Sequence, residues 1–199
     1  MRLVVLVSGS GTLLASLIDA TSNPEHPVDI VAVGADRSAI EGLARAERAG
    51  ISTFTVAPAD FADRNAWGAE LREVVASFEP DWILSAGFMR ILPAEFLSAF
   101  PNRVLNTHPA LLPAFPGAHG VRDALVYGAK VTGTTVHLVD EGVDTGPLVA
   151  QRAVEVEDGD TEESLHERIK VAERSLVVDV MTGIAVQGCT INGRRVTIP

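Results

Sequence analysis

The chain has 199 residues, of which 47% are hydrophobic, and a formal net charge of -10. This length suits one domain with a substantial core, and the acidic balance argues against nucleic-acid partners, which require clustered Lys and Arg. The single cysteine, Cys189, excludes an intrachain disulfide and a cysteine-based zinc site. No apolar run reaches the roughly 20 residues of a membrane span, and residues 3–7 are too few for a signal-peptide core. We therefore expect a cytoplasmic protein without a membrane partner.

Strands and helices alternate through the first half of the chain. Apolar, β-branched runs predict strands at 2–7, 28–36, 52–56, 81–88 and 103–108. Apolar residues at helical spacing predict helices between them, at 13–20, 40–50 and 61–78. This alternation predicts an α/β fold, a Rossmann-like and mostly parallel sheet with helices on both faces.

The pattern changes after residue 108. Residues 130–140 and 148–156 alternate apolar and polar side chains, as strands with one solvated side do. Asn192 and Gly193 stand between two short β-like runs and predict a hairpin near the C-terminus. We therefore expect an antiparallel portion in the second half.

A long amphipathic helix is predicted at 161–181, with Asp160 as its N-cap and Glu163 three residues later. No repeat or linker divides the chain. We expect one domain over the whole length, with a nucleotide-binding-like half at 1–108 and a second half at 109–199 that ends in the helix and hairpin.

A glycine-containing turn, with Gly9 and Gly11, follows the first predicted strand. Free backbone N–H groups at the start of the next helix suit a phosphate, although a tight turn without a ligand explains the same residues. A dinucleotide-binding fingerprint requires a third glycine where the chain has Leu14. The fingerprint is therefore incomplete, even though Asp36 stands near where a ribose-binding acid falls.

Asn106 and His108 end the strand predicted at 103–108 and are followed by a proline-rich loop. Side chains two apart on a strand share a face, so these two are expected about 7 Å apart on one side. Pro109 favours an extended conformation at His108. A histidine packed for structural reasons and a catalytic histidine remain alternatives at this point.

Three features stand at the carboxyl ends of predicted strands that are far apart in sequence: the glycine turn, Gly87 and His108. Ligands of open α/β sheets bind at the carboxyl ends of the strands, so we expect these features at one sheet edge. The turn at 139–147 contains three acids, which are either solvated or part of the site. If Asp144 folds back to His108, its charge favours the protonated imidazole, a general acid, with Asn106 as hydrogen-bond donor to an oxyanion.

Three motifs carry a resemblance to a known family: "SAGFMRIL" at 85–92, "NTHPALLPAFPG" at 106–117 and "VDEGVDTGP" at 139–147. With these motifs the chain resembles the folate-dependent formyltransferases over nearly its whole length. The run Asn-x-His-Pro-x-Leu-Leu-Pro is the specific part, whereas the glycine turn occurs in many folds. The resemblance implies the formyltransferase fold, with the folate site in the half at 109–199.

The activity that the resemblance implies is transfer of the formyl group of 10-formyltetrahydrofolate to the amine of glycinamide ribonucleotide, in de novo purine biosynthesis. These two small molecules are the implied partners, the formyl folate is the cosubstrate, and no metal is required. The implied catalytic residues are Asn106, which binds the formyl oxygen, His108, which donates a proton and stabilises the oxyanion, and Asp144, which keeps His108 charged and oriented.

The resemblance also implies two groups of binding residues. Those implied for the folate, with Arg64 near its glutamate tail, are Arg64, Met89, Arg90, Ile91, Leu92, Asn106, Asp140, Glu141, Gly142, Val143 and Asp144. Those implied for the ribonucleotide, with the last receiving the amine, are Gly11, Thr12, Leu13, Lys170 and Glu173. Related enzymes commonly carry Asn where this chain has Leu13, so phosphate binding here must depend on backbone N–H groups, Thr12 and Lys170.

Other interpretations remain open. His137 is expected as a packed or cross-strand residue, and a metal centre of His108, His137 and Asp144 lacks the tight spacings of known motifs. Within the superfamily, a methionyl-tRNA formyltransferase would carry a basic C-terminal domain, and a formyltetrahydrofolate hydrolase an N-terminal regulatory domain. A regulatory module that binds a nucleotide without turnover is a further alternative. The sequence does not decide the oligomeric state, and a homodimer is left open.

Overall fold

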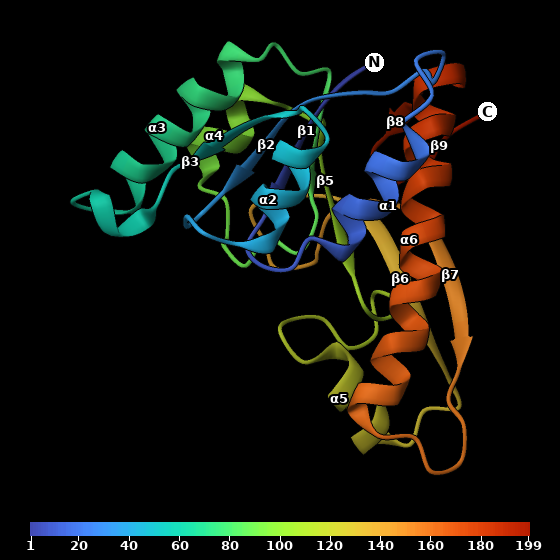
Figure 1. Cartoon of the computed structure of the whole chain (residues 1–199). Helices are drawn as coiled ribbons and strands as arrows, with labels where there is room; N and C mark the ends of the chain where they lie inside the picture. The colour runs from blue at the N-terminus through green and yellow to red at the C-terminus, as the bar shows by residue number, and fades with distance from the viewer. The chain divides into compact units, whose positions relative to one another are not determined.

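The computed structural model describes all 199 residues, which divide into two compact units, Met1–Asn106 and Thr107–Pro199. We call them unit 1 and unit 2. Unit 1 carries the parallel strands and unit 2 an antiparallel pair followed by the longest helix (Figure 1). None of the helices is both long enough and apolar enough to cross a membrane.

Unit 1 is built around parallel strands. These strands are β1 (Arg2–Val7), β2 (Asp29–Ala35), β3 (Ser52–Thr55), β4 (Trp82–Ser85) and β5 (Val104–His108), whose last two residues belong to unit 2. The helices between them are α1 (Thr12–Ala20), α2 (Glu41–Arg48), the short 3₁₀ helix Pro58–Asp60, α3 (Arg64–Ser77) and α4 (Ala94–Ala99). The strand order is β3-β2-β1-β4-β5, with all neighbours parallel.

The strand order reverses direction at β1, which makes it the centre of the unit. Residues 3–7 of β1 are fully buried, as a strand with helices on both sides must be. Right-handed crossovers place α1 and α2 on one face and α3 and α4 on the other (Figure 1). Within each pair the two helices contact each other. The predicted mostly parallel sheet with helices on both faces is confirmed.

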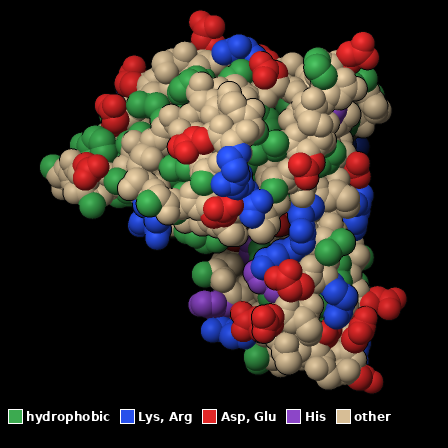
Figure 2. All heavy atoms as spheres, viewed as in Figure 1, with side chains coloured by type: hydrophobic (Ala, Val, Ile, Leu, Met, Phe, Trp, Pro, Cys, Tyr) green, Lys and Arg blue, Asp and Glu red, His purple; other side chains and the backbone are tan.

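Unit 2 consists of α5 (Gly120–Tyr127), β6 (Val131–Leu138), β7 (Leu148–Glu155), α6 (Glu162–Gln187), β8 (Thr190–Asn192) and β9 (Arg195–Thr197). β6 pairs with β7 and β8 pairs with β9, both antiparallel, so the predicted antiparallel portion and the hairpin at Asn192 and Gly193 are confirmed. α6 packs on both β6 and β7. Its polar face carries mixed charges, with acidic and basic side chains interleaved where α6 begins (Figure 2).

Three local expectations were wrong. The N-cap of α6 is Thr161 rather than Asp160, because Thr161 and Ser164 cap each other's backbone N–H groups while Asp160 is held by Arg168. The helices α4 and α5 were not predicted, since six and eight residues are too short for a clear apolar period. β6 is buried on both faces rather than one, because the loop after β5 and α6 both pack against it.

Candidate active site

The proline-rich loop after β5 is fastened to β6 and β7 through the buried hydroxyl of Thr135. Thr135 Oγ1 donates to Ala110 O at 2.7 Å and accepts from Leu112 N at 3.1 Å. Gln151 on β7 donates its Nε2 to Leu112 O at 2.8 Å. These contacts hold the loop in place beside His108, so the apolar, proline-rich composition serves to fix the backbone around that residue.

His108, the last residue of β5, is buried, and both of its ring nitrogens face acceptors. Nδ1 lies 3.2 Å from Asp144 Oδ2, and Nε2 lies 2.8 Å from Phe115 O. A carbonyl oxygen and an ionised carboxylate can only accept hydrogen bonds, so the doubly protonated imidazolium satisfies both contacts. Asp144 therefore does fold back onto His108 within unit 2.

Asp144 is held from three directions. Its Oδ2 accepts from Gly117 N at 2.8 Å as well as facing His108, and its Oδ1 lies 3.5 Å from His137 Nε2. Burial by itself raises the pKa of the Asp144 carboxyl, but the hydrogen bonds from His137 and Gly117, together with the charges of His108 and His137, lower it below its ordinary value. Asp144 also has φ 56, a left-handed conformation that is uncommon outside glycine. A charged carboxylate is thus aimed at two imidazoles.

His137 is the member of this cluster that sequence reasoning did not place in the site. Its side chain is buried near the end of β6, and its Nδ1 lies 2.9 Å from Leu138 O. The available signal was its position at the end of the strand that leads into the acidic turn. No group of His, Cys, Asp and Glu is placed to hold a metal ion, and both imidazoles direct a nitrogen at an oxygen of Asp144.

The acidic turn before Asp144 is shaped by Asp140. Asp140 Oδ1 accepts from Gly142 N at 3.1 Å and from Thr145 Oγ1 at 2.6 Å, while residues 140–143 are exposed. Arg194 of the C-terminal hairpin donates Nη1 to Thr145 O at 3.0 Å. The turn is therefore ordered by its own side chains and by the hairpin, and leaves its outer residues open to solvent.

Glu173 and Lys170 lie one turn apart on α6. Lys170 Nζ donates to Glu167 Oε1 at 2.7 Å. Burial raises the pKa of the Glu173 carboxyl above its ordinary value, against the hydrogen bond of Thr107 and the charges of Lys170 and Arg174, which lower it. Glu173 is thus the acid of this unit that holds a proton more readily than a solvated glutamate does.

In unit 1, four of the predicted folate residues line one cavity of about 550 Å³. These residues are Arg64, Met89, Arg90 and Ile91. Arg64 begins α3 and donates Nη2 to Ile91 O at 2.9 Å and to Leu92 O at 3.2 Å. The side chains of Met89 and Ile91 are exposed, whereas that of Leu92 is buried. Trp67, stacked on Phe88, completes an apolar wall of the cavity.

The glycine turn adopts the conformation that its residues permit. Gly11 has φ 65 and is the N-cap of α1, and a Cβ there would lie 2.7 Å from Gly42 Cα, so only glycine fits. Thr12 is exposed, and the side chain of Leu13 is buried in the core. No side chain caps the first N–H groups of α1. Leu13 therefore contributes to packing, and only its backbone can face a phosphate.

The carboxyl ends of β1, β4 and β5 meet at one edge of the unit 1 sheet. Leu6 pairs in register with Ser85, and Ser85 with Asn106. Ser8 N donates to Gly87 O at 3.2 Å, which joins the glycine turn to the segment after β4. Ligands of open α/β sheets bind at such a reversal of strand order. Asn106 lies at this edge, two residues before His108 on the same strand.

Asp36 is not available to a ribose. Its side chain is fully buried and its carboxylate is bound by Arg37 and Arg90. An acid that hydrogen-bonds a dinucleotide ribose must reach the ligand. Asp36 therefore gives no support to a dinucleotide site, whose fingerprint already lacks its third glycine.

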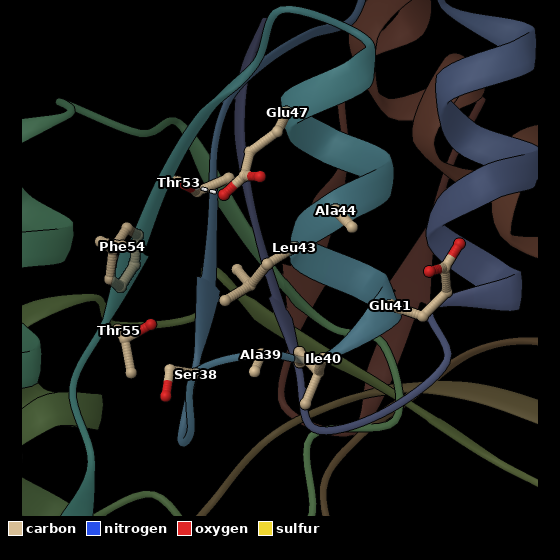
Figure 3. Close-up of a pocket in the computed structure, with 10 residues that line it drawn as sticks. All are labelled: Ser38, Ala39, Ile40, Glu41, Leu43, Ala44, Glu47, Thr53, Phe54 and Thr55. Atoms are coloured by element: carbon tan, nitrogen blue, oxygen red, sulfur yellow. Dashed lines mark hydrogen bonds between the residues drawn. The ribbon is translucent and has the colours of Figure 1, made fainter.

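A second hollow of unit 1 lies between α2 and β3 and has a volume of about 470 Å³ (Figure 3). Its charged side chains are Glu41 and Glu47, and Glu47 accepts a hydrogen bond from Thr53. It has no basic lining residue. The cavity with Arg64 and Arg90 is therefore the one that suits an anionic ligand.

Comparison with known proteins identifies the family of this chain. Residues 1–181 match the family described as formyl transferase. The chain belongs to the formyl transferase family. It is 56% identical over 197 residues to phosphoribosylglycinamide formyltransferase of Mycobacterium tuberculosis, covering 99% of this chain and 91% of the relative. It is 38% identical over 185 residues to the Escherichia coli enzyme of the same name, covering 93% and 87%.

The fold of this formyl transferase is also that of solved relatives. The crystal structure of glycinamide ribonucleotide transformylase 1 from Symbiobacterium toebii superposes with a TM-score of 0.96 at 43% identity, covering 100% of this chain and 93% of that one. Two features of this formyl transferase suit the family's chemistry. One is a buried imidazole and carboxylate pair that can move a proton, and the other is a cavity with apolar walls and two arginines.

Proposed function

We propose that this formyl transferase moves the formyl group of 10-formyltetrahydrofolate to the amine of glycinamide ribonucleotide, producing formylglycinamide ribonucleotide and tetrahydrofolate in de novo purine biosynthesis. The observation that carries the proposal is the contact between His108 and Asp144 in a chain 56% identical to a phosphoribosylglycinamide formyltransferase along its length. The formyl folate is the cosubstrate, and the proposed chemistry needs no metal.

In the proposed reaction, the amine nitrogen attacks the formyl carbon and forms a tetrahedral intermediate with a negatively charged oxygen. His108, as imidazolium, and the amide of Asn106 donate hydrogen bonds to that oxygen. The bond between the formyl carbon and N10 then breaks, and N10 takes a proton from His108. The proton that the former amine loses passes through solvent to the imidazole and restores its charge. Protons therefore balance, and Asp144 keeps His108 charged between turnovers.

The substrate oxygen has to compete for an imidazole nitrogen that is already engaged. Nδ1 faces Asp144, so Nε2 is the nitrogen proposed to turn from Phe115 O toward the substrate. The exchange replaces one hydrogen bond by another, which keeps its cost small. The charge on Asp144 remains in place throughout.

The binding residues are part of the same proposal. For the folate we propose the cavity residues Arg64, Met89, Arg90 and Ile91, with Leu92, Asn106, Asp140, Glu141, Gly142, Val143 and Asp144. For the ribonucleotide we propose Gly11, Thr12, Leu13, Lys170 and Glu173. The free N–H groups at the start of α1 support a phosphate there, and the raised pKa of Glu173 makes its carboxylate a better proton acceptor beside the proposed amine.

We place the enzyme in the cytoplasm, where purine precursors are made, and cell fractionation with detection of the chain measures this. Sedimentation of the purified chain measures whether it is a monomer or a homodimer.

The deciding experiment is an assay with purified protein, 10-formyltetrahydrofolate and glycinamide ribonucleotide. We expect formylglycinamide ribonucleotide and tetrahydrofolate in equal amounts, measured by chromatography of both products. A reaction lacking the ribonucleotide is the control and should release little formate. Formate release that is independent of the ribonucleotide would instead assign the chain to formyl folate hydrolysis.

A further inference from the structure

Asp36 is a buried carboxylate for which the proposed reaction has no direct use. It follows β2 at the carboxyl edge of the unit 1 sheet, and none of its side chain is exposed. A fully buried, ionised carboxylate is costly unless it is paired and hydrogen-bonded. Its partners therefore indicate what it is for.

Two arginines and one serine surround this carboxylate. Oδ2 lies 2.7 Å from Arg90 Nε and 2.9 Å from Arg37 Nη2, and Oδ1 accepts from Arg37 Nε at 3.2 Å. Burial by itself raises the pKa of Asp36, but the hydrogen bonds from Arg37, Arg90 and Ser8 lower it to about 2. The carboxylate is thus charged at any working pH.

The serine connects Asp36 to the backbone of the folate segment. Ser8 Oγ accepts from Met89 N at 2.8 Å. Ser8 is also among the groups that lower the pKa of Asp36, and since an ionised carboxylate can only accept, the Ser8 hydroxyl is the donor in that interaction. A short relay therefore runs from Met89 N–H through Ser8 to the buried charge.

Arg90 connects Asp36 to the folate cavity through its side chain. Its Nε is taken by Asp36, while the side chain is 42% exposed and lines the cavity with Arg64 and Met89. An arginine has five N–H donors in a rigid fork. With Nε occupied, the fork is held by one edge and the terminal Nη groups are left for a ligand.

We propose that Asp36, with Ser8, is a positioning residue for the formyl donor, which holds Arg90 by its Nε and the Met89 backbone in place for the folate. This inference rests on the proposed function of the segment 89–92. It predicts that loss of the Asp36 charge weakens binding of the formyl folate while the reaction of the bound donor is preserved.

Arg37 provides a matched comparison on the same carboxylate. Arg37 binds Asp36 through two nitrogens, yet it is not among the residues that line the cavity. If Asp36 acted only as a buried ion pair that stabilises unit 1, losing Arg37 would matter as much as losing Arg90. If Asp36 positions Arg90, only loss of the contact between Asp36 and Arg90 weakens binding of the formyl donor.

The test measures kcat and the KM for each substrate in Asp36→Asn, Ser8→Ala, Arg37→Ala and the exposed control Asp29→Asn. We expect Asp36→Asn to raise the KM for 10-formyltetrahydrofolate about tenfold or more, since a hydrogen bond to a charged group contributes about that much. The KM for glycinamide ribonucleotide and the saturated kcat should change less than about threefold. Ser8→Ala should raise the same KM by a smaller factor, and Arg37→Ala and Asp29→Asn should leave it unchanged.

An unchanged KM for the donor in folded Asp36→Asn overturns the inference, and so does an equal rise of both KM values. If Asp36→Asn does not fold, an unchanged donor KM in Ser8→Ala overturns it. Calorimetric binding of tetrahydrofolate to wild type and to Asp36→Asn separates this result from the proposed reaction. Weaker binding by the variant supports the positioning role even if no formyl transfer is detected, whereas no binding by wild type overturns both.

Discussion

Two carboxylates of this chain, one buried and one partly buried, have similar surroundings and opposite consequences. Asp144 in unit 2 lies between the imidazoles of His108 and His137, and Asp36 in unit 1 lies between the guanidinium groups of Arg37 and Arg90. In both cases the basic partners lower the pKa of the carboxyl. An imidazole loses and regains its proton near neutral pH, whereas a guanidinium does not.

This difference assigns the two clusters to different tasks. A carboxylate with imidazole partners supports proton movement, because the partner can give up its proton while the carboxylate stays charged. A carboxylate with guanidinium partners holds a fixed geometry at every working pH. The four predictions below test whether the two clusters differ in this way, from the largest expected effect to the smallest.

Replacement of His108 by alanine tests the imidazole cluster directly. Loss of a general acid lowers turnover by roughly 10²–10⁴-fold, and the fold should persist because the loop is held by Thr135 and Gln151. Turnover and circular dichroism of His108→Ala measure the two effects, with His26→Ala as the control. Near-normal turnover in the His108 variant would rule out the proposed mechanism.

Replacement of Asp144 by asparagine removes the charge and keeps the shape of the side chain. We expect turnover to fall on the order of 10²-fold, because a buried imidazolium without its counter-charge gives up its proton. The pH range in which the variant is active should move to lower pH. A pH–rate profile measures this shift, with Asp158→Asn, at an exposed position, as the control. An unchanged profile would contradict the role of Asp144 as charge partner.

The acid stability of unit 1 tests the arginine cluster. The pKa of Asp36 is lowered from 3.8 to about 2, so its charge stabilises the fold above pH 4 and this contribution disappears as the pH falls toward 2. The contribution amounts to about 2 kcal/mol. Denaturant unfolding of wild type and Asp36→Asn between pH 5 and pH 2 measures it. The difference between the two proteins should shrink over this range, and a constant difference would contradict the assignment.

Replacement of His137 by asparagine separates the two imidazoles on Asp144. His137 stands 3.5 Å from Oδ1 and bonds to the backbone with its other nitrogen, so its part is to orient the carboxylate. We expect kcat to fall about tenfold or less, with both KM values unchanged, while His166→Asn on α6 has no effect. Steady-state kinetics measures this, and a loss as large as that of His108→Ala would make His137 an equal partner.

Elements with strong local signals were predictable from the sequence. The apolar run at 2–7 is β1, with the predicted bounds. Its last five residues are all buried, as the unbroken apolar run predicts for a strand covered on both faces. α6 was found from its apolar stripe, although its cap is one residue later and its end six residues later than expected. The misses at α4 and α5 concern short helices whose formation depends on what they pack against.

Some residues of the candidate site were likewise predictable from the sequence, and others were not. Asn106 and His108 stood out because two polar side chains ended an apolar strand and preceded prolines. Asp144 was one of three acids in its turn, and the resemblance singled it out, because its left-handed backbone and its return to His108 leave no mark in local composition. His137 was not placed in the site, because the one signal, its position at the end of the strand before the acidic turn, does not show which group the side chain faces.

The sequence by itself determined the alternation of strands and helices, the acidic balance, and the strand end that carries His108. These follow from local propensity, periodicity and steric limits, which act between near neighbours. Tertiary structure alone decided that Asp144 meets two imidazoles, that Leu13 turns into the core, and that Asp36 is closed off by two arginines. Each of these depends on which distant side chains share a buried volume, and burial is what turns a solvated charge into a paired one.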